Sequence, residues 1–189
     1  MPTVALIAGS TRSGSVNRRL ARAIALRLED EDGVRADVVD LSDYPMPIYD
    51  GDDEAAHGVP DSAIRLAERL SRADAVVFIS PEYNASLTPL LKNTIDWLSR
   101  DVAPHRPFDR VFALAAASPG GLGGIRMLSH MRDILVSIGA REIVTPQLAV
   151  GGAGQAFGEA GDEAGRLVAE RPARLLNGMV AILLARIAG

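Results

Sequence analysis

The chain has 189 residues, 48% of them hydrophobic and 23% charged, which is typical of a globular protein with an apolar core. It contains no cysteine, which excludes disulfides, thiolate metal sites, iron–sulfur clusters and cysteine nucleophiles, so any redox chemistry would need a cofactor. The formal charge is -4 and the arginines are scattered, which argues against nucleic acid as a partner. No apolar run is as long as a membrane span and the first residues carry no basic leader, so we expect a soluble, cytoplasmic protein without membrane attachment.

Short runs rich in Val, Ile, Leu and Ala predict parallel strands that are covered on both faces. In chain order they occupy residues 3–9, 35–41, 74–80, 110–117 and 141–150. Between them, apolar residues recur every three or four positions, which predicts helices over 16–28, 64–70, 87–98 and 122–138. Gly139 is the expected end of the fourth helix, and Pro172 lies in the expected first turn of a last one.

This alternation predicts an α/β fold: a flavodoxin-like three-layer sandwich around a five-stranded parallel sheet of order 2-1-3-4-5. No repeat or low-complexity segment interrupts it. Two long loops, over residues 42–60 and 151–162, are expected to border a functional site because long ordered loops commonly do.

The sequence GSTRSGSVNRRLA, over residues 9–21, joins the first strand to the first helix. A helix N-terminus at a strand end can hold a phosphate through unpaired N–H groups, with Ser10, Ser15 and Arg12 as further donors. Asn17 would either cap the helix or reach the same oxygens. The same residue types also form ordinary caps and turns, so the loop alone leaves both interpretations open. The loop lacks the P-loop lysine and the three-glycine dinucleotide fingerprint, which favours a terminal monophosphate.

Two further strand ends carry polar or glycine-rich loops that should face the same crevice. The sequence SPEYNASLTPLLKNTIDWLS follows the third strand, with Asn84 or Ser86 as a possible cap for a helix that starts near Leu87. The sequence ASPGGLGGIR follows the fourth strand, and its glycines would let backbone N–H groups approach a flat polar ring. A phosphate anchor beside two such loops suits a nucleotide-like ligand.

These three motifs, in this order, resemble those of the NADPH-dependent FMN reductase family, which includes quinone, azo-dye and chromate reductases. The resemblance covers about the first 140 residues, and only the layout agrees beyond them. It implies a single flavodoxin-like FMN-binding domain over residues 1–189, with FMN and NADPH (or NADH) as cofactors. The cofactor-binding residues that it implies are Gly9, Ser10, Arg12, Ser15, Val16, Asn17, Pro81, Glu82, Tyr83, Asn84, Ser118, Gly120 and Gly121.

Within that resemblance, the loop at 9–17 would bind the FMN phosphate, the loop at 81–84 the isoalloxazine and the loop at 118–121 its pyrimidine edge. Many family members have glycine after the Pro-Glu-Tyr-Asn run, whereas this chain has Ala85, so the ring is expected to be held slightly differently. Tyr83 has an alternative interpretation as an aromatic residue at the edge of the core.

The resemblance implies hydride transfer from NAD(P)H through FMN to a small-molecule acceptor such as a quinone, an azo compound, chromate or free flavin. Because the cofactor carries this chemistry, we expect no catalytic side chain, and three dispersed histidines give no metal site. The alternatives are a flavodoxin-like electron carrier and a flavin-based redox sensor.

The helix expected between Leu87 and Ser99 matches one that commonly lies in a dimer interface of the family, which implies a homodimer or a dimer of dimers. Trp97 is expected in that interface rather than in ordinary packing. Lys92 and Asp96 form an i,i+4 pair, which is by itself a modest helix stabiliser. Arg126 is either a helix-face partner or a counter-charge for the 2′-phosphate of NADPH.

Overall fold

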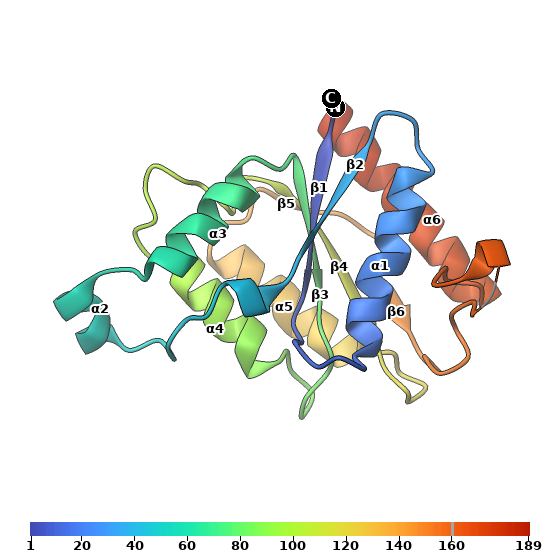
Figure 1. The fold of residues 1–189 in the computed structure, drawn as a ribbon, viewed down its shortest axis with the longest axis horizontal. Helices are drawn as coiled ribbons and strands as arrows, with labels where there is room; N and C mark the ends of the chain where they lie inside the picture. Colours follow the sequence, from blue (N-terminus) through green and yellow to red (C-terminus); the bar gives the residue numbers. More distant parts are fainter. Residues whose placement is uncertain (160) are drawn as a thin grey trace.

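The computed structural model describes residues 1–159 and 161–189, which form a parallel sheet between two layers of helices (Figure 1). The sheet has six strands in the order β2-β1-β3-β4-β5, with β6 also pairing with β4. The predicted strand order is therefore confirmed, with one strand more than expected. The strands are β1 (Thr3–Ala8), β2 (Arg35–Val39), β3 (Ala75–Ile79), β4 (Val111–Ala117), β5 (Glu142–Ile143) and β6 (Leu148–Val150).

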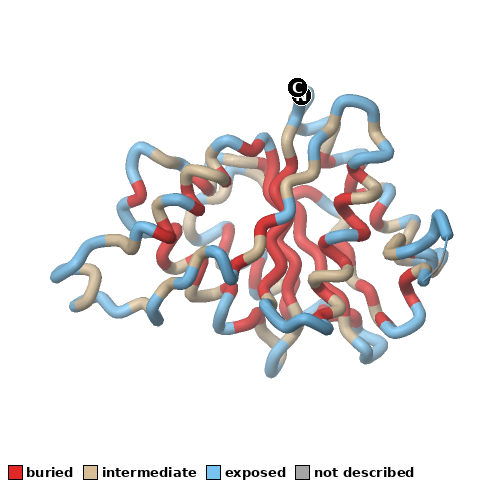
Figure 2. Tube along the Cα trace, in the orientation of Figure 1, coloured by how far each residue is buried: buried red, intermediate tan, exposed pale blue. Residues whose placement is uncertain are grey.

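Helices cover both faces of the sheet, which explains why its central strands are apolar at every position. One core lies against α1 and α6 and takes Val4, Leu6 and Ala8 from β1, whereas Ala5 and Ile7 enter the other core, against α3, α4 and α5. Figure 2 shows the buried residues concentrated along the strands. The helices are α1 (Val16–Glu29), α2 (Gly51–His57), α3 (Asp61–Ser71), α4 (Pro89–Leu98), α5 (Ile125–Ser137) and α6 (Glu170–Ala188).

The strand predicted over residues 141–150 is wrong as one continuous element, because it divides into β5 and β6. Pro146 lies between the two pieces and has no N–H to donate to a sheet. β5 pairs with the beginning of β4 and β6 with its end, so both pieces still extend the sheet on the same side.

Two predicted helix starts are also wrong. Helix α4 is capped by Thr88, whose side chain accepts a hydrogen bond from the Leu91 N–H, and not by Asn84 or Ser86. Helix α5 begins at Ile125, after a glycine-rich turn, and Ile125 itself is exposed. Gly139 follows the end of this helix with a φ of 77°, as predicted for a terminating glycine.

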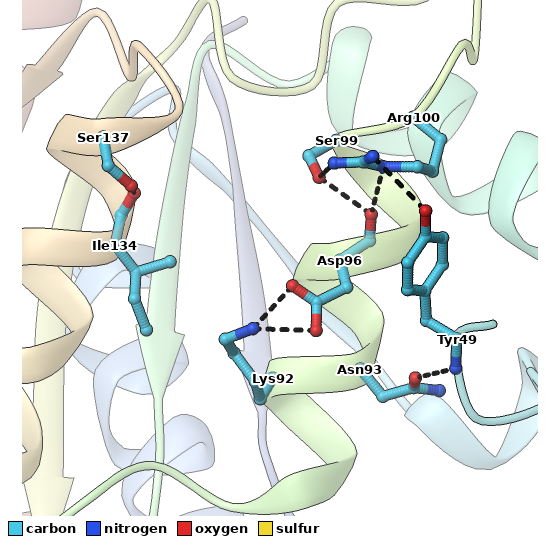
Figure 3. A network of polar contacts seen from close by, with 8 residues as sticks. All are labelled: Tyr49, Lys92, Asn93, Asp96, Ser99, Arg100, Ile134 and Ser137. Atoms are coloured by element: carbon cyan, nitrogen blue, oxygen red, sulfur yellow. Dashed lines mark hydrogen bonds and ion pairs between the residues drawn. The ribbon is translucent and has the colours of Figure 1, made fainter. Parts of the chain in front are cut away.

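The segment over residues 42–60, predicted as a loop at the site, contains α2 and projects beside α4 (Figure 1). Asn93 of α4 accepts a hydrogen bond from the Tyr49 N–H (2.8 Å, Figure 3) and donates one to the Pro47 carbonyl (2.7 Å). The Arg100 guanidinium lies over the Tyr49 ring, 5.2 Å from its centre. These contacts fasten the segment to α4.

Trp97 is covered by this segment, which corrects the expectation that it lies in an interface between subunits. Its side chain is fully buried within the chain, its indole N–H donates to the Pro47 carbonyl (2.8 Å) and its ring meets Tyr49 edge-on at 5.1 Å. The Lys92–Asp96 pair does form, with the ammonium 2.7 Å from a carboxylate oxygen (Figure 3).

Among the described residues, no helix combines the length and the apolar character that crossing a bilayer requires.

Candidate functional site

The loop between β1 and α1 presents hydrogen-bond donors at a helix N-terminus. Ser15 is the N-cap of α1, and its hydroxyl accepts a hydrogen bond from the Arg18 N–H (3.3 Å). The Arg12 side chain is exposed and donates to the Gly14 carbonyl (3.3 Å). The N–H groups of Val16 and Asn17 point out of the first turn, where a helix has no acceptor of its own. The loop thus combines a cap with unused donors, and the two interpretations of the sequence are compatible.

Asn17 is almost fully buried, and its amide joins α1 to the end of β4. The amide nitrogen donates to the Ala117 carbonyl (2.8 Å), and the amide oxygen accepts from the Ala117 N–H (2.8 Å). The side chain therefore does not cap the helix, and Ala117 takes up its amide oxygen and one of its two amide N–H groups. We conclude that Asn17 acts on the site by fixing the distance between the first and third loops.

Gly9 is a position of close approach between β1 and α4. A Cβ atom there would lie 2.9 Å from the Leu91 Cβ and 3.0 Å from the Thr88 hydroxyl, which itself donates to the Gly9 carbonyl (2.8 Å). Gly9 is buried in this contact, so its part in the site is to let the loop begin close to α4.

The loop after β3 forms a tight hairpin. Tyr83 and Ser86 exchange both backbone hydrogen bonds, at 2.9 and 3.0 Å, and the two residues between them have positive φ angles of 49° and 67°. Two left-handed central residues are characteristic of a type I′ turn, which favours Asn-Gly. Asn84 suits this turn, whereas Ala85 is strained in it. The turn holds Tyr83 with 54% of its surface exposed, which argues against a place in the core.

Replacing Ala85 by glycine should raise the free energy of unfolding by about 0.5–1 kcal/mol. Glycine removes the left-handed strain, which is worth about 1–2 kcal/mol, but adds about 0.4–1 kcal/mol of backbone entropy to the unfolded chain. Urea unfolding monitored by circular dichroism would measure the difference. The same substitution at Ala181, an exposed position in the interior of α6, should instead destabilise by about 1 kcal/mol. An equal loss at both positions would contradict the strained turn.

Glu82 connects the loop after β3 to the start of α5. Its carboxylate accepts hydrogen bonds from the N–H groups of Arg126 (3.1 Å) and Met127 (3.4 Å) and forms an ion pair with the Arg126 guanidinium. Burial opposes ionisation of this carboxylate, but those bonds hold the pKa of Glu82 below its usual value. Arg126 is therefore paired across two loops and not with a neighbour on its own helix face, while its role as a counter-charge for NADPH stays a prediction.

The third loop, after β4, packs on the segment that follows β6. Ser118 donates its backbone N–H to the Val150 carbonyl (2.9 Å), and its hydroxyl accepts from the Gly120 N–H (3.1 Å). Gly120 and Gly121 are exposed, and a Cβ on Gly151 would come within 2.4 Å of the Gly121 carbonyl oxygen. Glycine at 151 is thus required for the two segments to touch, a contact that the sequence did not predict.

The three loops enclose one cavity of about 240 Å³, here called the strand-end pocket. The structure brings most of the predicted cofactor-binding residues to its wall. It leaves Gly9, Asn84, Gly120 and Gly121 off the wall, and it adds Ala117 and Pro119, which sequence patterns did not single out. No residue of the 42–60 segment lines the pocket, so that loop does not border it as expected. The lining residues are Ser10, Arg12, Ser15, Val16, Asn17, Pro81, Glu82, Tyr83, Ala117, Ser118 and Pro119.

The chemistry of this wall fits a flavin mononucleotide. At one end, Arg12, Ser10 and the first turn of α1 offer charge and donors suited to a dianionic phosphate. At the other, Pro81, Tyr83 and Pro119 offer flat apolar surface suited to a ring system. The fold is flavodoxin-like, a class in which ligands bind at the carboxyl ends of the strands, and the strand-end pocket lies at those ends.

Comparison with known proteins identifies the family within this class. The sequence pattern of the NADPH-dependent FMN reductases matches residues 2–155, and the chain belongs to that family. Its members are FMN-dependent NAD(P)H oxidoreductases, which confirms FMN and NAD(P)H as the cofactors. The chain is 36% identical to an NAD(P)H-dependent FMN reductase of Pseudomonas aeruginosa, over 90% of this chain and 87% of that one.

Further relatives agree in sequence and in structure. A quinone reductase of Escherichia coli is 37% identical over 76% of this chain and 74% of its own. The flavoenzyme FerB of Paracoccus denitrificans, an NAD(P)H:acceptor oxidoreductase, superposes with a TM-score of 0.79 at 28% identity, over 100% of this chain and 98% of that one. The likeness to FerB thus extends through β6 and α6, beyond the stretch that carries the sequence motifs.

Proposed function

We propose that this chain, as one domain, holds FMN in the strand-end pocket and reduces a small planar acceptor at the expense of NAD(P)H. The observation that carries this proposal is the convergence of three separate loops on one cavity with a phosphate-binding end and a ring-binding end. Bound FMN would accept a hydride from the nicotinamide and pass electrons to the acceptor. The protein's part is to position these molecules against each other.

Each loop has a distinct part in this arrangement. Arg12, Ser10, Ser15 and the N–H groups of Val16 and Asn17 would bind the phosphate, and Asn17 would keep the neighbouring loops at a fixed distance through Ala117. Pro81 and Tyr83 would support the ring. Ser118 and the N–H groups of Gly120 and Gly121 would face its polar edge. Glu82 would align the second loop with the third through α5.

Tyr83 favours an acceptor with a planar ring, such as a quinone, over chromate. Its exposed ring stands at the pocket mouth on a turn whose two backbone hydrogen bonds hold it in place. An aromatic side chain in this position offers a flat face to another ring. A likeness to quinone reductases supports the same choice.

The function is tested by mixing FMN-loaded protein with NADPH without oxygen and following the visible flavin absorbance. We expect the absorbance to bleach within a second and to return when a benzoquinone is added, over many turnovers. Azo dye, chromate and free FMN serve as competing acceptors in the same assay. Bleaching over minutes, with no turnover, would instead support an electron carrier or a sensor.

We also propose that two copies associate through α4 and the segment that covers it, in a dimer or a dimer of dimers. Support comes from the exposed apolar side chains of Ile48, on that segment, and Leu90, on α4. Replacing Ile48 by glutamate should lower the molar mass measured by light scattering from that of a dimer to that of one chain. An unchanged mass would contradict this interface.

Because the reaction depends on cellular NAD(P)H, we place the protein in the cytoplasm.

A further inference from the structure

A second cavity, of about 640 Å³, lies on the outer side of α1 and is here called the arginine cavity. Its walls are the turn at Ser13 and Gly14, three arginines of α1, and Gly158, Glu159 and Gly165 from the chain after β6. Ser15 and Val16 line both this cavity and the strand-end pocket, so the two meet at the first turn of α1. The arginine cavity therefore adjoins the turn that would hold the FMN phosphate.

The three arginines are Arg18, Arg19 and Arg22, and two of them are held in place by other contacts. Arg18 pairs with Asp40 (2.7 Å) and donates to the Thr11 carbonyl (3.1 Å). Arg19 donates to the Gly158 carbonyl (3.2 Å) and pairs with Glu159 (3.2 Å) while lying over the Phe157 ring. Both guanidinium groups are thus preorganised at the cavity wall, so that little side-chain entropy would be lost on binding.

Arg22 differs from its neighbours because it is exposed and forms no ion pair with any residue in 1–159 or 161–189. One turn of helix separates it from Arg18. Of the two carboxylates nearby, Asp40 is neutralised by Arg18 and also accepts hydrogen bonds from the Ser42 N–H (3.0 Å) and hydroxyl (2.7 Å). Glu159 is matched by Arg19. The cavity therefore keeps one positive charge in excess, which favours an anion.

We propose that the arginine cavity binds the 2′-phosphate of NADPH, and that Arg22 makes the protein prefer NADPH to NADH. This inference rests on the proposed function. When the nicotinamide faces a ring in the strand-end pocket, the remainder of the dinucleotide must lie outside, because that pocket holds only about 240 Å³. The adjoining cavity has the size of a nucleotide site and offers guanidinium groups, which bind phosphate by paired hydrogen bonds.

The test compares the two nucleotides in an Arg22→Ala variant. We expect kcat/KM for NADPH to fall about tenfold and that for NADH to change less than about twofold, because only NADPH carries the lost contact. Arg22→Lys should recover part of the NADPH activity, since it restores the charge without the paired geometry. Arg65→Ala, which removes an exposed arginine from α3, is the matched control and should leave the NADPH:NADH ratio unchanged.

Binding measured without turnover provides a second readout. In calorimetric titrations of the FMN-loaded protein, 2′,5′-ADP should bind more tightly than 5′-AMP, and Arg22→Ala should remove that difference while FMN content stays constant. Equal losses for NADPH and NADH, or an unchanged ratio, would overturn the arginine site while leaving the oxidoreductase function intact. If neither nucleotide reduces the unaltered protein, the proposed function itself fails.

Discussion

Replacing Arg12 by alanine and Ser15 by glycine should weaken FMN binding at least a hundredfold but change riboflavin binding less than about threefold. Hydrogen bonds to a charged group contribute about 1.5–3 kcal/mol each, so two lost phosphate contacts amount to roughly 3–6 kcal/mol. Each 1.4 kcal/mol is about a factor of ten in affinity. Riboflavin has the same ring without the phosphate and should be affected little. Quenching of flavin fluorescence on titration into the apoprotein measures both affinities.

Glycine at position 15 is chosen because Ser15 also caps α1. Serine-to-glycine changes at an N-cap cost only a few tenths of a kcal/mol, whereas alanine would cost about 1 kcal/mol and confuse binding with folding. Arg12 contributes little to the fold, since its one described contact is a 3.3 Å bond to Gly14 at the surface. Arg65→Ala controls for the loss of a surface charge. Equal losses of FMN and riboflavin affinity would contradict a phosphate site in this loop.

The sequence specified the layers and strand order because both depend on patterns repeated along whole elements. Runs such as AVVFI in β3 must be buried on two faces, and the spacing of Leu20, Ile24 and Leu28 in α1 allows one helical face only. Where the bounds of an element depend on a single residue, the repeated pattern did not predict them. Pro146 divides the last strand, and Thr88 rather than an earlier residue caps α4, since both outcomes depend on local backbone geometry.

The structure brings the three predicted loops together, whereas the contacts of several of their residues differ from those expected. Motif order places three loops at one sheet edge, as the strand-end pocket confirms. Motifs do not reveal that the Glu82 carboxylate faces the start of α5, or that Trp97 lies under Pro47, because these partners are 44 and 50 residues away along the chain. The same holds for Asn17, whose partner is 100 residues away.

Asn17→Ala should lower the free energy of unfolding by about 3 kcal/mol. The change leaves the N–H and the carbonyl of Ala117 without partners in a buried place, and each unsatisfied group costs about 1–3 kcal/mol. Because Ala117 precedes Ser118, the third loop would also lose its fixed position, and FMN affinity should fall with stability. Urea unfolding of the apoprotein and an FMN titration measure the two effects separately.

Asn93 provides a matched control, since its amide also bridges a backbone N–H and a carbonyl, those of Tyr49 and Pro47. There water can replace the amide, because the contact with the Pro47 carbonyl is exposed. Asn93→Ala should therefore cost only about 1 kcal/mol and leave FMN affinity unchanged. If both variants lose the same stability, burial of the Asn17 bridge is not what makes it strong. If Asn17→Ala is destabilised but binds FMN normally, the bridge supports the fold without positioning the site.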